Sequence, residues 1–247
     1  MTERLFHNLS EERKKEISEN IRAVKAGIDD AVRAGGRGKS VTLLAATKTV
    51  PAEQINYATQ VCGITDIVEN RVQELLSKYD DLIKDNVKIH FIGQLQTNKV
   101  KYIVDKVDMI HSVDSEKLAR EINRQAQKHG KIMEVLVEIN IGREENKGGV
   151  MPEQAGELAD LIDELDHLKL AGIMTIAPIS EENEKKLQFF SETYQIYLDI
   201  CEKKRHNRDR YILSMGMSDS YPQAIACGSD LVRVGSALFG ARPKAVQ

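Results

Sequence analysis

A lysine closes one of the most apolar segments of the chain. Lys48 follows the run 41–47, Val-Thr-Leu-Leu-Ala-Ala-Thr, and precedes the segment 49–51, Thr-Val-Pro. Taking an ammonium group out of water at the end of a buried strand is costly, so an amine in that position titrates easily. A neutral lysine amine is a nucleophile towards aldehydes. Lys48 is therefore a candidate nucleophile, and the alternative is a strand-end lysine that reaches back to solvent.

Glycine and serine gather at the ends of the last two apolar runs, in the segments 214–218 and 233–236. Each segment leads into a short helical stretch, and the first N–H groups of a helix beside hydroxyl groups form an anion site. Barrel proteins often bind a phosphate after strands 7 and 8. A pair of ordinary tight turns would also explain the glycines. The phosphate interpretation depends on Ser214, Gly216, Ser218, Gly235 and Ser236.

Arg233 is expected inside a barrel or at its rim, where the guanidinium needs an acceptor. A carboxylate, a phosphate or a ring nitrogen would serve, and a structural salt bridge to Glu69 is an alternative. An aldehyde-reactive lysine that faces a phosphate site, with an arginine between them, suits pyridoxal 5′-phosphate (PLP) as the cofactor. For the polar residues at other strand ends, we prefer the explanation that polar loop residues follow any strand: Gln94, Ser112 and Asn140.

The elements that must position these residues alternate regularly between short apolar runs and amphipathic segments. A helix is expected first, with a start at Asn8 and Glu11 and one apolar face formed by Ile17, Ile21, Val24 and Ile28, ended by the glycine-rich turn 35–38. The predicted strands are 41–46, 65–68, 87–92, 108–112, 132–140, 168–174, 210–214 and 230–234. Helical patterns lie between them, with weaker ones after strands 1, 3 and 7. Pro152 suits a first helical turn, and Gly228 suits the position after a helix end.

Eight strand–helix units predict a closed (β/α)8 TIM barrel in the α/β class, because 247 residues are close to the roughly 250 that such a barrel needs. A doubly wound open sheet is the alternative. We expect one domain over residues 1–247, with an N-terminal helix and turn in 1–38 and the barrel in 39–247.

The composition of the chain limits the kinds of partner that we expect. The net charge is −3, with 30% charged and 41% hydrophobic residues and no Trp, so no nucleic-acid partner is expected. No segment reaches the ~18 apolar residues of a membrane span, and no leader peptide is visible, so we expect a cytoplasmic protein without a membrane partner. Cys62, Cys201 and Cys227 are far apart and are predicted to be buried, reduced thiols.

Six ordered motifs resemble the YggS/PROSC family, the pyridoxal phosphate homeostasis proteins, along nearly the whole chain. They lie in residues 43–49, 69–74, 90–99, 171–174, 213–219 and 232–242. The resemblance implies a fold type III PLP barrel like that of alanine racemase, but without the C-terminal β domain. Two small departures occur: Ile67-Val68 stands where the family often has Phe-Gly, and Ser236 often appears as Thr. Neither removes chemistry that PLP binding needs.

The resemblance also implies roles for individual residues. Lys48 matches the lysine that forms the covalent aldimine with PLP. Arg233 matches the arginine that faces the pyridine nitrogen. The phosphate-holding positions are matched by Ser214, Gly235 and Ser236, and the remaining cofactor-binding positions by Asn70, Met174, Met215 and Gly216.

Two other motifs do not support a function. The segment 38–40, Gly-Lys-Ser, imitates the end of a P-loop, but Arg33 occupies the place of its first glycine and the segment precedes a strand. The histidines form no i, i+4 pair, so no metal is expected. His90, beside the third strand end, either lines the pocket or is a hydrogen-bonded core residue.

Two classes of function fit such a cofactor site. A carrier would bind PLP, shield its aldehyde and deliver it in intracellular PLP homeostasis, and a racemase-like enzyme would turn over amino acids. We favour the carrier, because the chain after the last strand leaves no room for the second domain of racemases, and because Arg233 should keep the pyridine nitrogen unprotonated. A Schiff-base aldolase that uses Lys48 without PLP is a third, weaker hypothesis. We expect no catalytic residue, transient contacts with PLP-dependent apo enzymes at most, and a monomer.

Overall fold

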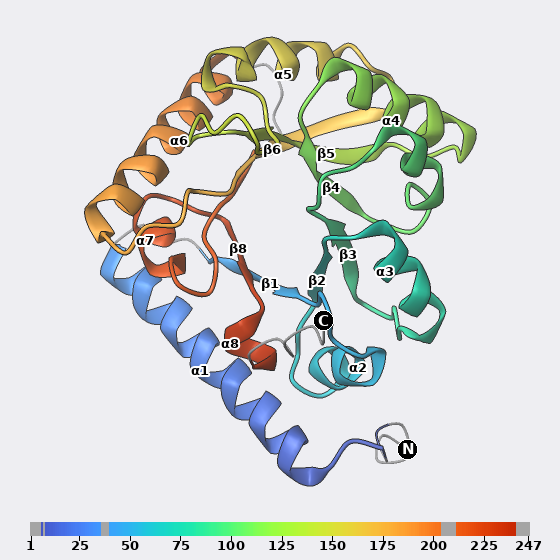
Figure 1. Ribbon diagram of the computed structural model, residues 1–247, viewed down its shortest axis with the longest axis vertical. Helices are drawn as coiled ribbons and strands as arrows, with labels where there is room; N and C mark the ends of the chain where they lie inside the picture. Colours follow the sequence, from blue (N-terminus) through green and yellow to red (C-terminus); the bar gives the residue numbers. More distant parts are fainter. Residues whose placement is uncertain (1–5, 7, 36–39, 204–210, 241–247) are drawn as a thin grey trace.

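Eight parallel strands close into a barrel in sequence order, from β1 next to β2 round to β8 next to β1 (Figure 1). The computed structural model describes residue 6 and residues 8–35, 40–203 and 211–240. The strands are β1 (Thr42–Ala46), β2 (Asp66–Glu69), β3 (Lys88–Phe91), β4 (Met109–Val113), β5 (Met133–Ile139), β6 (Leu168–Thr175), β7 (Ile212–Ser214) and β8 (Leu231–Val234). The predicted closed barrel is confirmed, and the open sheet is excluded.

The predicted strand limits agree with these bounds to within one residue, except at the start of β7. That strand begins at Ile212, two residues after the predicted start, and residue 210 lies outside the described residues. The agreement follows from the burial of the strands. Both faces of a parallel barrel are covered, so its strands appear in the sequence as continuous apolar runs.

Helices surround the barrel and fill its connections (Figure 1). They are α1 (Glu11–Gly35), α2 (Ala52–Gln60), α3 (Val72–Lys78), η2 (Tyr79–Asp81), η3 (Thr97–Tyr102), α4 (Glu116–Lys128), η4 (Pro152–Gln154), α5 (Ala155–Asp163), α6 (Asn183–Lys203), α7 (Tyr221–Ala226) and α8 (Ser236–Phe239). The connection after β3 carries only the 3₁₀ segment η3, and α7 is short, as the weak patterns predicted. Within the described residues no helix is both long enough and apolar enough to cross a bilayer.

The first helix begins later than predicted. Ser10, not Asn8, caps it, because the Ser10 hydroxyl accepts the backbone N–H of Arg13 at 3.2 Å. The predicted apolar face of α1 is buried, and Gly35 is its last residue. The turn residues 36–38 and the predicted boundary at residue 38 lie outside the described residues.

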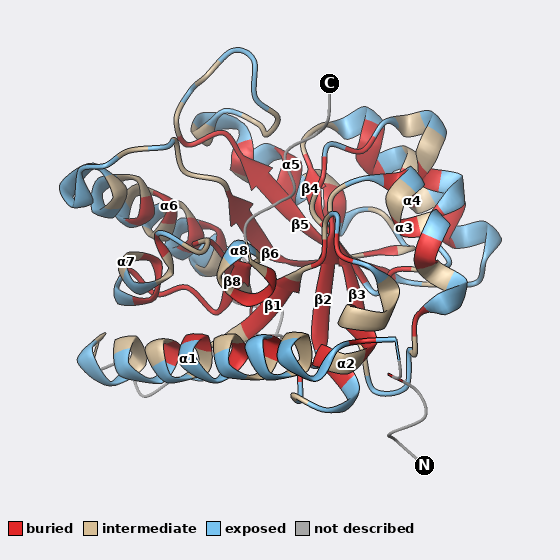
Figure 2. Cartoon of the chain, turned by 60° about the horizontal axis from the view of Figure 1, so that its bottom comes forward, coloured by how far each residue is buried: buried red, intermediate tan, exposed pale blue. Residues whose placement is uncertain are grey.

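The barrel has two separate apolar layers, which alternate residues of each strand supply. Leu43 and Ala45 face the helices and belong to the large core cluster. Leu44, between them, belongs instead to a small cluster that fills the barrel interior with Val68 and Leu231. Figure 2 shows the strands as the most buried part of the molecule. The interior also carries polar side chains, and these define the site described below.

The long helix α1 lies outside the barrel, beside α7 and α8 (Figures 1 and 2). It therefore approaches the two segments that leave β7 and β8. Arg13 of α1 donates to the carbonyl of Phe239 at 2.7 Å, and Asn20 donates to the carbonyl of Leu238 at 3.2 Å. These bonds attach the C-terminal end of α8 to α1.

The three cysteines are free thiols, as predicted. Their burial agrees only in part with the prediction. Cys227 is buried, whereas Cys62 and Cys201 are half-buried.

Candidate functional site

Lys48 lies in the turn that leaves β1, and this turn has an unusual backbone. Thr49 adopts a φ of 66°, a left-handed conformation that is unfavourable for a β-branched residue. Hydrogen bonds hold it there: its backbone N–H donates to the Glu74 carboxylate, and its hydroxyl donates to the Lys48 carbonyl at 2.6 Å. The backbone N–H of Val50 bonds back to the Thr47 carbonyl at 3.0 Å. Together these bonds fix the direction in which the Lys48 side chain leaves the turn.

A buried ion-pair cluster supports this turn from the outer side of the barrel wall. We call it the Lys78 cluster; it comprises Lys78, Glu69, Glu74 and Thr47. The amine of Lys78 lies 2.7 Å from Glu69 Oε1 and 3.3 Å from Glu74 Oε1, and it donates to the Thr47 carbonyl at 2.8 Å. Burial raises the pKa of Glu69, although Lys78 and the Thr47 hydroxyl act in the opposite direction. The charge of Lys78 is thus neutralised within the wall.

The two serine–glycine turns, 214–218 and 233–236, meet beside the Lys48 turn. The backbone N–H of Gly235 donates to the Ser218 hydroxyl at 3.3 Å, and the N–H of Arg233 donates to the Gly216 carbonyl at 3.0 Å. Gly216 has a φ of 95°, and a side chain there would collide with Ala224. Ser236 is exposed and opens α8. A hydroxyl pair and the N-terminal end of α8 therefore face the same space.

Close packing against β1 favours glycine at position 235. A Cβ there would lie 3.1 Å from the carbonyl oxygen of Ala46 and 3.2 Å from its side chain. This close approach brings the start of α8 next to the strand that carries Lys48. The predicted lysine and the predicted phosphate turns consequently lie on the same end of the barrel.

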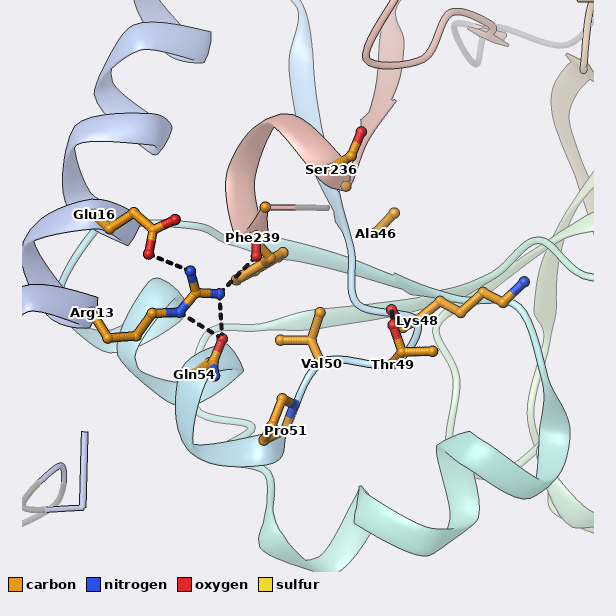
Figure 3. Close-up of a pocket in the computed structure, with 12 residues that line it drawn as sticks. Arg13, Glu16, Ala46, Lys48, Thr49, Val50, Pro51, Gln54, Ser236 and Phe239 are labelled. Carbon is orange, nitrogen blue, oxygen red and sulfur yellow. Dashed lines mark hydrogen bonds and ion pairs between the residues drawn. The ribbon is translucent and has the colours of Figure 1, made fainter. Parts of the chain in front are cut away.

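A pocket of about 430 Å³ lies at this junction and is lined by residues of α1, α2 and α8. Figure 3 shows the side chains that line it. Arg13 closes one side of the pocket through hydrogen bonds to Gln54 and Glu16 and to the carbonyl of Phe239. The Lys48 side chain extends away from Arg13 in this view. The pocket is lined by Arg13, Glu16, Ala46, Lys48, Thr49, Val50, Pro51, Gln54, Gly235, Ser236, Phe239 and Gly240.

Arg233 lies inside the barrel and is 3% exposed. Its guanidinium donates to the Ser214 hydroxyl at 2.6 Å and to the Thr175 carbonyl at 2.7 Å. Burial lowers the pKa of Arg233 to about 10, and the charge of Glu138 opposes this shift. The salt bridge to Glu69 that the sequence allowed is excluded, because Glu69 faces the outer wall and pairs with Lys78. No carboxylate lies within ion-pair distance of Arg233 in the described part of the chain.

Glu138 is a buried carboxyl group that the sequence analysis did not identify. It follows Leu136 by two residues on β5, so it points into the barrel interior with that residue. Burial raises the pKa of Glu138 to about 7; the neighbouring Asp114 adds to the shift, and Arg233 opposes it. Glu138 can therefore hold or release a proton near neutral pH. Its signal in the sequence was a charge on the inward face of an apolar strand.

The other predicted site residues differ in burial and in the part of the barrel where they lie. Asn70 directly follows β2 and is half-buried, whereas Met174 is fully buried in the interior cluster beneath the mouth of the barrel. The side chain of Met215 packs in the large core outside the barrel. Ser214 is fully buried and bonded to Arg233, so the hydroxyl beside Gly235 is that of Ser218.

Of the polar strand ends, Gln94 and Asn140 fit the structural explanation that we preferred, whereas Ser112 lies within β4 and is buried, so it is not a loop residue. Gln94 is exposed. Asn140 bonds both ways with the backbone of Glu144 and so shapes the loop after β5. His90 is a core residue, bonded to Asp66 and His111. The described residues contain no cluster of His, Cys, Asp or Glu suited to a metal ion.

Comparisons with known proteins identify the family of the chain. A family model described as "Alanine racemase, N-terminal domain" matches residues 14–243. The chain is 42% identical over 225 residues to a protein of Aquifex aeolicus named "Pyridoxal phosphate homeostasis protein", covering 91% of this chain and 97% of that one.

Two solved structures are similar over their whole length. A protein of unknown function from Bifidobacterium adolescentis has a TM-score of 0.88 and 36% identity, with 94% of this chain and 97% of that chain covered. PipY of Synechococcus elongatus, in a structure with PLP bound, has a TM-score of 0.78 and 29% identity, with 91% and 100% covered. The fold and the site define an alanine racemase-type barrel domain. Within that class, the chain belongs to the family of pyridoxal phosphate homeostasis proteins.

Proposed function

We propose that this protein binds PLP and acts in intracellular PLP homeostasis, as a carrier that holds the cofactor and delivers it. The observation that carries the proposal is the meeting of Lys48 with the serine–glycine turns at one end of the barrel. Gly235 packs on Ala46, two residues before Lys48, so an amine and an anion site lie within reach of one small molecule. The PLP-bound structure of PipY supports the assignment.

The residues present fit this cofactor. Arg233 is a buried cation whose acceptors within the described chain are neutral, a hydroxyl and a carbonyl. It therefore retains hydrogen-bonding capacity for one more acceptor, and the pyridine nitrogen of PLP can supply it. For the phosphate, Ser218, Gly235 and Ser236 offer two hydroxyl groups and the first N–H groups of α8.

Each assigned residue has a distinct task. Bound PLP supplies an aldehyde, and the amine of Lys48 is the nucleophile that holds it. Asn70 and Met174 are assigned to line the cofactor, and the backbone at Met215 and Gly216 belongs to the turn that carries Ser218. Ser214 acts through Arg233 and does not contact the phosphate in this assignment.

The carrier role is preferred over a racemase-like enzyme for an electrostatic reason. A guanidinium that faces the pyridine nitrogen disfavours a second positive charge there, so the ring withdraws electrons less strongly. The names of the relatives point the same way. The match to the racemase family model favours the enzyme as the second candidate. We propose little or no amino-acid turnover, a monomer, and transient delivery of PLP to apo enzymes.

Lys48→Ala tests the proposal. The wild-type protein with PLP should show visible absorbance that Lys48→Ala lacks, and borohydride reduction should attach a pyridoxyl group to Lys48, identified by mass spectrometry. A substrate-sized adduct without PLP would indicate a Schiff-base aldolase. Rapid racemisation of a common amino acid by the pure protein would establish the enzyme.

A second experiment tests the phosphate assignment. Replacing Ser218 and Ser236 together by Ala should weaken PLP binding at least tenfold, through the loss of two hydrogen bonds to a charged group. Binding of unphosphorylated pyridoxal should change little. Equal losses for the two ligands would contradict the assignment. Ser40→Ala, on an exposed serine before β1, is the control that should change neither affinity.

A further inference from the structure

A continuous chain of hydrogen bonds crosses the barrel interior and ends at Arg233. It runs from Asp66 Oδ1 to His90 Nε2 at 3.1 Å, and from His90 Nδ1 to His111 Nε2 at 2.9 Å. It continues from His111 Nδ1 to Ser214 Oγ at 3.3 Å, and from Ser214 Oγ to Arg233 at 2.6 Å. Five strands contribute one residue each, and none of the five residues is more than 9% exposed.

The two ends of this chain have fixed roles. Arg233 can only donate, so the oxygen of Ser214 must accept from it. At the other end, burial alone would raise the pKa of Asp66, but hydrogen bonds from His90 and Thr65 lower it below its usual value. Asp66 is therefore a carboxylate that can only accept, and Nε2 of His90 must carry a hydrogen.

The middle of the chain then has a single arrangement when both histidines are neutral. Burial, together with the charge of Arg233, lowers the pKa of His111 well below its usual value, so His111 is neutral. Neutral His90, with its hydrogen on Nε2, presents a bare Nδ1 that must accept from Nε2 of His111. His111 then presents a bare Nδ1, which accepts the hydroxyl hydrogen of Ser214. The opposite tautomer of His111 would place two lone pairs face to face at 2.9 Å.

This polarity determines how Ser214 meets Arg233. The only hydrogen of the Ser214 hydroxyl is committed to His111, so a lone pair points at the guanidinium. The Thr175 carbonyl holds the other nitrogen at 2.7 Å. These two acceptors leave the remaining N–H groups of Arg233 without a partner among the described residues, and Glu138 is the carboxyl group whose charge acts on the guanidinium.

We propose that a relay of four side chains positions Arg233 for its contact with the cofactor ring: Ser214, His111, His90 and Asp66. These are positioning residues, since none contacts the cofactor in our assignment, and the inference rests on the proposed PLP site. The relay extends to Asp66 at the beginning of β2, the opposite end of the barrel from Lys48. It thereby links the ring contact to a carboxylate far from the cofactor.

Two ligands that differ at one ring atom test the relay. We compare PLP with 1-deaza-PLP, in which a carbon replaces the pyridine nitrogen. Ser214→Ala should weaken PLP binding about tenfold, the effect of one hydrogen bond to a charged group, and leave 1-deaza-PLP binding unchanged. His111→Phe should act in the same direction.

Ser112→Ala is the matched control. Ser112 is also a buried serine, on β4 next to His111, but its hydroxyl has no partner among the described residues. This variant should leave the PLP to 1-deaza-PLP ratio unchanged. An equal loss of both ligands in Ser214→Ala would overturn the relay, because a merely structural role affects both ligands alike.

A measurement on the ligand-free wild-type protein is independent of the cofactor assignment and of variant folding. Nitrogen-15 NMR of labelled histidine should show His90 and His111 both protonated on Nε2. Protonation of His111 on Nδ1 would overturn the relay even if PLP binds at Lys48. Failure of the protein to bind PLP, with the tautomers as expected, would overturn the proposed function and the ring contact while the hydrogen-bond chain itself stands.

Discussion

Lys78 and Arg233 are both buried in this barrel, and the surroundings of these two cations differ. Lys78, in the outer wall, lies within 3.3 Å of two carboxylates, those of Glu69 and Glu74. Arg233, in the interior, bonds within the described residues only to a hydroxyl and a carbonyl. Glu138 attracts Arg233 through space but forms no ion pair with it among the described residues. The fold neutralises the charge of Lys78 and leaves the guanidinium of Arg233 available for a further acceptor.

The difference separates structural charge from functional charge. A buried ion pair is close to neutral for stability as long as both partners are present, and it fixes geometry, here that of the Lys48 turn. A buried cation without a carboxylate partner raises the free energy of the ligand-free protein. The presence of such a cation therefore indicates a ligand that supplies the missing acceptor. The same reasoning distinguishes Glu69, which is committed to Lys78, from Glu138, which is not.

The largest expected effect comes from breaking the neutralised pair. Lys78→Met leaves the carboxylate of Glu69 buried without its cation and should lower the free energy of unfolding by about 3–5 kcal/mol. Urea denaturation at pH 7 measures this. Arg120→Met, which removes an exposed pair with Glu116, is the control and should change stability by no more than about 0.5 kcal/mol. Similar small losses in both variants would abolish the distinction drawn here.

The second prediction concerns the unpaired carboxyl group. The pKa of Glu138 is raised from 4.5 to about 7, so the folded protein binds this proton more tightly than the unfolded chain. The resulting stability is complete below pH 4.5 and is lost as the pH rises through about 7. Relative to Glu138→Gln, the wild type should lose up to about 3 kcal/mol across this window.

Urea denaturation of wild type and Glu138→Gln at pH 4.5, 6 and 8 checks this prediction, and the difference between the two proteins cancels the other titrating groups. Arg233→Met should move the transition to higher pH, because the attraction that favours the ionised form of Glu138 is removed. A stability difference independent of pH would show that folding does not raise the pKa of Glu138.

A smaller effect on stability is expected at Arg233 itself. Arg233→Met leaves the acceptors Ser214 and Thr175 without a donor but strands no charged partner, so the loss should be about 1–2 kcal/mol. PLP binding should fall at least tenfold in the same variant, since a hydrogen bond to a charged donor is lost. Thermal unfolding with and without PLP measures both quantities. A loss as large as that in Lys78→Met would mean that the two cations are equivalent.

The sequence was sufficient to predict the barrel and to predict that Lys48 and the turn at 233–236 lie at the same end of it. Buried parallel strands leave continuous apolar runs, and the carboxyl ends of such strands meet on one face. This placed Lys48 and the turn at 233–236 together without coordinates. The i, i+4 spacing of Glu74 and Lys78 was also visible, but their pairing with Glu69 depends on how α3 packs against β2.

The rest depends on register across strands that are far apart in sequence. His90 and His111 each interrupt an apolar strand, which is a signal, yet their contact follows from the pairing of β3 with β4. Ser218, and not Ser214, accepts the N–H of Gly235, and the turn between the two serines includes Gly216 with a positive φ, which the sequence alone does not show. Periodicity in a sequence shows which face a residue occupies, and it does not show its neighbour.

The smallest prediction measures the strain that the Lys78 cluster holds in the Lys48 turn. Thr49 has a φ of 66°, and Asn tolerates this conformation better than a β-branched residue, so Thr49→Asn should stabilise the protein by about 1 kcal/mol. Asn86 already has a φ of 59° on an exposed turn, so Asn86→Thr should destabilise the protein by a similar amount and serves as the reverse control.

Because Lys78 holds the carbonyls of Thr47 and Val50 on either side of Thr49, the turn should relax in Lys78→Met. Thr49→Asn should therefore stabilise the protein less in that background. An undiminished gain in the double variant would show that the turn keeps its shape without the cluster.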